Sequence, residues 1–161
     1  MEPRVIGYRR LPLPPARISA FHSGVVIAIR AMGSFDDPAV QRQAFDLALT
    51  DELRLSELRY LFGAAMGHRA SAPVLYAWEK EHWAALRERM PSLGRGQLVR
   101  IASVLCSRAD TDDARTFFEA NTKGIEATRR ALDESLEEAG LCTALHDHGA
   151  PAVAAYLKTR H

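Results

Sequence analysis

Apolar residues recur at helical spacing along most of this chain, and glycine or proline separates one apolar stripe from the next. Leu58, Leu61, Phe62 and Ala65 form the clearest stripe, and Gly67 follows it directly. Residues three and four positions apart share one face of an α-helix, so each stripe predicts an amphipathic helix. Outside the first 30 residues, no stretch alternates convincingly with the period of two that a half-buried β-strand requires. The pattern predicts an all-α protein of about seven or eight helices.

Several helix boundaries follow from capping residues. Asp37 stands directly before a proline, and a side-chain oxygen there can accept hydrogen bonds from the free amides of the first turn. For the same reason we expect Ser56 to cap the next helix, and Asp110 or Thr111 to cap a later one. Glycine and proline in the segment 149–151 predict a break before the last helix. The other stripes lie within residues 25–32, 40–48, 75–86, 98–105, 125–142 and 153–157.

Short connections between the stripes favour antiparallel neighbours. An amphipathic helix gains little alone, and stacked helix pairs bury each stripe with local contacts. We therefore predict an α-α superhelix of HEAT or armadillo type, as one helical-repeat domain over residues 23–161. Residues 1–22 contain Pro12, Pro14 and Pro15, and predict an irregular lead-in because proline removes donors and favours extended neighbours.

Composition narrows the class of protein. With 161 residues, 47% hydrophobic and 25% charged, the chain has the length and make-up of one globular domain. A net charge of +1 gives no electrostatic case for nucleic acid or an anionic membrane as a partner. No apolar run approaches the roughly 18 residues of a membrane span, and no secretory signal is recognisable, so we favour a cytoplasmic location. The bias towards arginine and alanine indicates a bacterial source.

Metal-binding motifs are sparse. Glu79-x-x-His82 matches one arm of a carboxylate-bridged di-iron site, but the second arm is missing. The favoured interpretation is a core or boundary histidine with a solvated glutamate, on the side of the helix away from Leu75. His146 and His148 could hold a metal only with ligands from elsewhere, and a helix C-terminus already favours protonated histidine. We predict no metal site in this chain.

Both cysteines fall on apolar stretches of predicted helices, where Cys106 and Cys142 are expected as small buried hydrophobic residues; a disulfide or metal pair is the alternative. Trp78 and Trp83 lie about 140° apart around a helix. We expect one to pack in the core and the other against a neighbouring helix.

Motifs for self-sufficient catalysis are absent. No His-Glu-x-x-His zinc helix, serine elbow or Cys-x-x-Cys motif occurs. The Gly94-Arg95-Gly96 segment could present amides to an anion, but it lacks the remainder of a phosphate loop and is interpreted as a turn. The residues alone therefore predict a binding, capping or scaffolding role.

Two stretches are similar to a known family. Residues 25–90, with an Asp-Pro helix start and the Trp-x4-Trp helix of Trp78 and Trp83, resemble the C-terminal helical domain of zinc aminopeptidases of the aminopeptidase N type. The puromycin-sensitive and endoplasmic-reticulum aminopeptidase branch is the most similar. Residues 125–157 look like the bacterial version of the end of that domain.

The resemblance implies a non-catalytic segment that forms the lid and wall of a peptide chamber, as a fragment or a separately encoded remnant. Zinc and the catalytic residues would belong to a separate domain, with which the chain would share its peptide substrate. Arg59, Arg95 and Arg100 lie near predicted helix ends and are candidates for contacting that peptide. The alternative is a free-standing helical scaffold that binds a protein or peptide on its concave face. An apolar end exposed by loss of the upstream helices would permit a homodimer.

Overall fold

The computed structural model describes residues 15–90 and 94–159, with side chains from residue 23 onward. Every regular element in these ranges is helical, which confirms the predicted all-α class. The elements are α1 (Pro15–Met32), α2 (Pro38–Asp46), η1 (Leu47–Leu49), α3 (Leu55–Gly67), α4 (Ser71–Glu81), α5 (Trp83–Arg89), α6 (Arg95–Leu98), η3 (Val99–Val104), α7 (Arg108–Asn121), α8 (Glu126–Ala144), η4 (Leu145–Gly149) and α9 (Ala150–Lys158).

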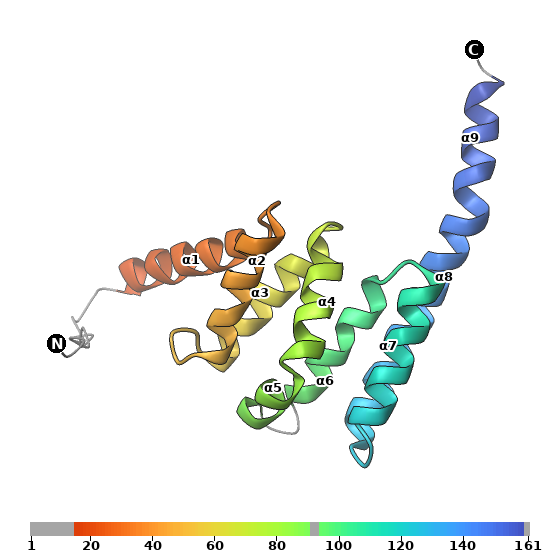
Figure 1. The fold of residues 1–161 in the computed structure, drawn as a ribbon. Helices are drawn as coiled ribbons and strands as arrows, with labels where there is room; N and C mark the ends of the chain where they lie inside the picture. Colours follow the sequence, from red (N-terminus) through yellow and green to blue (C-terminus); the bar gives the residue numbers. More distant parts are fainter. Residues whose placement is uncertain (1–14, 91–93, 160–161) are drawn as a thin grey trace.

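The helices stack side by side in chain order and build a superhelix of two layers (Figure 1). One layer contains α1, α3, the α6–η3 segment and α8; α2, α4 and α7 form the other. Within the first layer α1 packs on α3 and η3 packs on α8, while α3 with α4 and α7 with α8 join the layers. Among the helices that the structure describes, none is both long enough and apolar enough to cross a bilayer.

The core lies between the two layers and is formed by the apolar stripes. Every residue of the predicted α3 stripe is buried, and so are Leu98 of α6 and Val99, Ile101 and Ala102 of η3. Trp78 is fully buried against Phe45 and Phe62, with ring centroids 5.8 and 6.1 Å away. Its indole N–H donates to Asp46 Oδ1 over 2.8 Å, so the one polar atom of this large side chain is satisfied. The largest fully buried apolar side chains are Trp78, Phe45, Phe118, Leu58, Leu61, Leu75, Leu86, Leu98, Ile101 and Leu132.

Helix caps agree with the sequence at one position and differ at two. Asp37 caps α2, and its Oδ1 accepts from Ala39 N at 2.8 Å, as predicted. Ser56 does not cap α3, because the helix begins one residue earlier and Glu57 Oε2 accepts from the Arg54 amide. In α7 the cap is Ser107, three residues before the predicted Asp110, whose amide donates to the Ser107 hydroxyl. Ser107 lies just before the first turn of α7, so its hydroxyl can accept from the Asp110 amide, which has no partner within the helix.

The single long helix expected around residues 71–90 is two helices. Backbone angles of φ −104° and ψ 14° at His82 interrupt the helix between α4 and α5. The change of direction lets both tryptophans reach apolar surroundings despite their separation around an ideal helix. Trp83 packs on Phe117 and Phe118 of α7, with ring centroids 5.6 and 5.5 Å away, and is only 5% exposed. Both tryptophans therefore lie in the core, each against neighbouring helices, whereas the sequence predicted a core position for one alone.

At the N-terminal end, α1 already begins at Pro15, so the irregular lead-in does not extend to residue 22 as predicted. The polyproline segment before it lies outside the described residues. Proline is tolerated in the first helical turn because its missing N–H would have no partner there. Helix α1 ends before Gly33, where a Cβ atom would overlap the backbone carbonyl of Leu61 in α3. Glycine therefore permits the close approach of these two helices.

At the C-terminal end, the predicted break at 149–151 does not occur. A π-turn, η4, carries the backbone from α8 into α9, and Pro151 lies in the first turn of α9. Figure 1 shows α9 continuing the direction of α8 beyond the two layers. No residue of α9 is buried, so the predicted stripe containing Val153, Tyr156 and Leu157 does not enter the core.

Candidate functional site

The three candidate arginines have different surroundings. The Arg95 guanidinium donates to the carbonyls of Met90 and Arg87, at 3.3 and 2.9 Å, and so closes the end of α5. Arg59 is exposed on α3 and lies over the Tyr60 ring, 4.6 Å from its centroid, with a 2.6 Å hydrogen bond to the phenol oxygen. Arg100 is exposed on η3.

Arg59 and Arg100 share one further property. Neither forms an ion pair with any carboxylate in the described part of the chain. Their helices, α3 and η3, belong to the same layer and are in contact. These two guanidinium groups can therefore donate hydrogen bonds to an external carboxylate without breaking an internal ion pair. We call Arg59 and Arg100 the arginine pair.

A polar bridge on the opposite layer joins α4 to α7. Tyr76 Oη and Lys80 Nζ both donate to Asp113 Oδ2 over 2.6 Å, and Lys80 also lies over the Tyr76 ring. The hydrogen bond from Lys80, then that from Tyr76, lowers the pKa of Asp113. Burial, followed by the bond to Asp113, raises the pKa of Tyr76. The bridge holds α4 against α7, and its two charged groups, Lys80 and Asp113, pair with each other.

Glu79 is a correction to the sequence analysis. It was expected to be solvated, but it is 1% exposed, and its Oε2 has no hydrogen-bond partner among the described residues. Burial raises the pKa of Glu79 well above its ordinary value. The spacing itself contains the reason, since Glu79 lies four residues after Leu75 and therefore on the same face of α4.

The histidine patterns do not assemble a metal site. His82 is half-buried with its ring 4.9 Å from the Trp78 ring, and His146 Nδ1 lies 3.6 Å from Asp147. Within residues 15–90 and 94–159, no three His, Cys, Asp or Glu side chains gather as a metal-binding group. The residues described here therefore do not provide the ligand set that a catalytic zinc requires.

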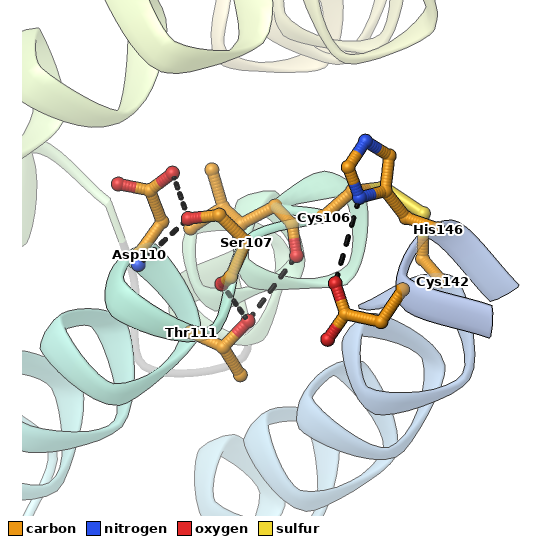
Figure 2. Close-up of a disulfide and its surroundings, with 8 residues drawn as sticks. Cys106, Ser107, Asp110, Thr111, Cys142 and His146 are labelled. Carbon is orange, nitrogen blue, oxygen red and sulfur yellow. Dashed lines mark hydrogen bonds and ion pairs between the residues drawn. A yellow bond between two sulfur atoms is a disulfide. The ribbon is translucent and has the colours of Figure 1, made fainter. Parts of the chain in front are cut away.

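Cys106 and Cys142 form a disulfide, with Cα atoms 5.2 Å apart, and are not the free buried thiols that the sequence favoured. Figure 2 shows the bond joining the connector before α7 to the last turns of α8. Beside it, Thr111 donates to the Leu105 and Ser107 carbonyls at 3.2 and 2.8 Å. Both cysteines are half-buried. The disulfide fastens the end of α8 to the connector before α7, and so to the stacked helices α1 to α7, which we call the body.

An open groove of about 1000 Å³ lies beside the disulfide. One wall belongs to the helical body, at the α3–α4 turn and the connector before α7, and includes Met66, Pro73 and Val104. The other wall belongs to η4 and α9 and includes Leu145, Val153 and Leu157. We call this space the C-terminal groove. None of Arg59, Arg95 and Arg100 lines it.

Most of these features carry little sequence signal. The disulfide has none beyond an even number of cysteines, because its partners are 36 residues apart. Burial of Glu79 was available from helical spacing, whereas the C-terminal groove depends on the direction that α9 takes after η4. The sequence indicated Arg59 and Arg100 as candidates for peptide contact. Their lack of carboxylate partners among the described residues is known only from the structure.

Comparison with known proteins gives one match. The family described as the ERAP1-like C-terminal domain matches residues 17–140. No curated protein and no solved structure matches the chain. The matched region runs from within α1 to within α8 and includes the arginine pair, but it ends before η4 and α9.

Proposed function

Because this chain belongs to the ERAP1-like C-terminal domain family, whose members are C-terminal domains of ERAP1-type aminopeptidases, we propose that it forms part of the lid and wall of a peptide chamber. This domain alone is not the catalytic part of such an enzyme. In the proposal the chain is the bacterial form of the domain, from the puromycin-sensitive and endoplasmic-reticulum branch. Its zinc site and catalytic residues belong to a separate domain, which holds the amino end of the same peptide.

The family match is the observation that carries this proposal. The described structure adds support, since stacked helices offer an extended surface that a peptide can follow. The arginine pair supplies the chemistry for contact, because guanidinium groups bind carboxylates through charge-assisted, frequently bidentate hydrogen bonds. Arg59 and Arg100 would thus meet the carboxylate end or acidic side chains of a peptide. Arg95 is a weaker candidate in this proposal, because two of its guanidinium nitrogens already donate to backbone carbonyls.

Fluorescence anisotropy with a labelled peptide of about ten residues tests the contact directly on the full chain. The Arg59→Glu, Arg100→Glu double variant should weaken binding about tenfold or more, since it places like charges where the carboxylate would lie. Arg115→Glu is the matched control, because Arg115 is also exposed but lies on α7 and faces Glu119 at 4.0 Å. Blocking the peptide carboxylate as an amide should reproduce part of the loss.

Equal binding by the double variant and the control would contradict the role of the arginine pair. The free-standing scaffold remains the alternative function. A pull-down that recovers a partner unrelated to peptidases, with no peptide binding, would favour that alternative.

A further inference from the structure

Helix α9 is largely apolar, and yet every one of its residues is exposed. From Ala150 to Leu157 it has no charged side chain, and none of its residues is buried. Its substantial packing contact within the described chain is with η4, the turn that precedes it. A helix that is apolar all round is normally buried, because its side chains gain free energy by leaving water. Another surface is therefore needed to stabilise α9.

The C-terminal groove shows where such a surface would lie. Leu145, Val153 and Leu157 face the groove while 71%, 58% and 55% exposed. The body wall opposite them combines apolar residues such as Met66 and Pro73 with the polar Arg69 and Asp110. The groove thus has one apolar wall and one mixed wall, and its volume of about 1000 Å³ is of a size to admit another helix.

Helix α9 itself has the properties of that missing helix. Its opposite face contains Ala152 and Ala155, and small side chains let one helix lie close to another surface. An α9 from a second copy, entering antiparallel, would put its larger residues against the first α9 and these alanines against the body wall. Antiparallel pairing also opposes the two helix dipoles, which is favourable.

Charges at the two ends of the segment 147–158, which we call the tail, set the register of an antiparallel pair. Asp147 and Lys158 are about three helical turns apart and so lie on one side of the tail. In an antiparallel pair centred between Ala152 and Val153, Lys158 of each copy is level with Asp147 of the other. Within its own chain, Asp147 has Oδ2 3.7 Å from Arg108 Nη2 and Oδ1 3.6 Å from His146 Nδ1. Its side chain is nevertheless 45% exposed, so a further cation can reach the carboxylate. A two-fold axis repeats the contact, so the tail is complementary to itself.

We propose that this chain forms a two-fold symmetric dimer in which α9 of each copy occupies the C-terminal groove of the other. The occupant is a second copy of this chain because the tail of that copy supplies both the apolar face and the opposite charges at the two ends. The proposal is independent of the peptide-chamber function, since α9 lies outside the matched family region and away from the arginine pair.

Sedimentation velocity of the full chain, across roughly 1–100 µM, measures the association, because this range brackets micromolar dissociation constants. The mass should rise with concentration from 17.8 kDa towards twice that value. Leu145→Glu and Val153→Glu should each raise the dissociation constant about tenfold or more. Leu141→Glu is the matched control, because Leu141 is on the same continuous helix and 69% exposed but does not line the groove; it should leave association unchanged.

A charge exchange tests the register independently of overall folding. Asp147→Lys and Lys158→Asp should each weaken the dimer, and the double variant should recover most of the lost association. Circular dichroism of every variant shows whether the body remains helical. A monomer at all concentrations, as would result if α9 closed onto its own body at η4, would overturn the proposal. So would loss of association in Leu141→Glu equal to that in Leu145→Glu, or no recovery in the double variant.

Discussion

Helices α4 and α9 start from similar sequences and end in opposite surroundings. Each has an Ala-Pro pair in its first turns, followed by valine, tyrosine and a large apolar residue. In α4, Leu75 and Trp78 are fully buried, because α2, α3 and η3 pack around that helix. In α9, Val153 and Leu157 stay more than half exposed, because its one substantial packing contact with a described element is with η4. The spacing of apolar residues thus determines which face of a helix gains stability from burial. The neighbouring helices determine whether that face is buried.

The largest expected effect is at the covered helix. Leu75→Ala should lower the free energy of unfolding by about 2–5 kcal/mol, because it removes buried methyl groups and leaves a cavity between fixed helices. Urea denaturation followed by circular dichroism measures the change. A loss below about 0.5 kcal/mol would mean that α4 is not packed as described.

The disulfide comes next, since it fastens α8, the last covered helix, to the body. Replacing Cys106 and Cys142 together with serine should reduce the free energy of unfolding by about 2–4 kcal/mol, because the cross-link closes a loop of 36 residues in the unfolded chain. A reductant should lower the urea midpoint of the wild type and leave that of the double variant unchanged. If the reductant shifts both midpoints equally, the bond does not stabilise the fold.

Glu79 gives an effect that depends on pH. Because burial raises the pKa of Glu79, the folded chain holds this proton more tightly than the unfolded chain, whose carboxyl has an ordinary pKa of 4.5. The wild type therefore loses stability as the pH rises above 4.5. Glu79→Gln should be about 1–3 kcal/mol more stable near neutral pH, and this gain should vanish below pH 4.5. A gain that is the same at both pH values would show that ionisation is not its cause.

The smallest effect is at the uncovered helix. Leu157→Ala should change the free energy of unfolding by less than about 0.5 kcal/mol when the chain is dilute enough to be monomeric. The substitution matches Leu75→Ala in chemistry and differs in burial, so the same urea titration compares them. A loss of several kcal/mol in the dilute chain would mean that α9 is packed against its own body.

The fold was predictable where local spacing decides the outcome. The α3 stripe and the Asp37 cap follow from helical spacing and capping chemistry, and the structure confirms them. The caps at Ser56 and Asp110 were wrong because several polar residues adjoin each helix start and only the backbone path selects one. The break at His82 depends on the packing of α7, which local spacing does not contain.

The site was less predictable because its features come from distant residues. Pairing of Cys106 with Cys142, the occupied guanidinium of Arg95 and the exposure of α9 all depend on which helices meet. Glu79 is different, since its spacing from Leu75 already indicated burial. A charged residue type predicts an exposed side chain at this position, whereas the helical spacing predicts the burial that the structure shows.

The central claim is that this chain holds a peptide and does not cut it. Mass spectrometry of a peptide of about ten residues, incubated with the purified 161-residue chain and Zn²⁺ and then separated into retained and free fractions, tests both parts at once. The account predicts peptide retained by the chain and recovered at full length. Recovery of peptides shortened from the amino end, or no peptide in the retained fraction, would contradict it.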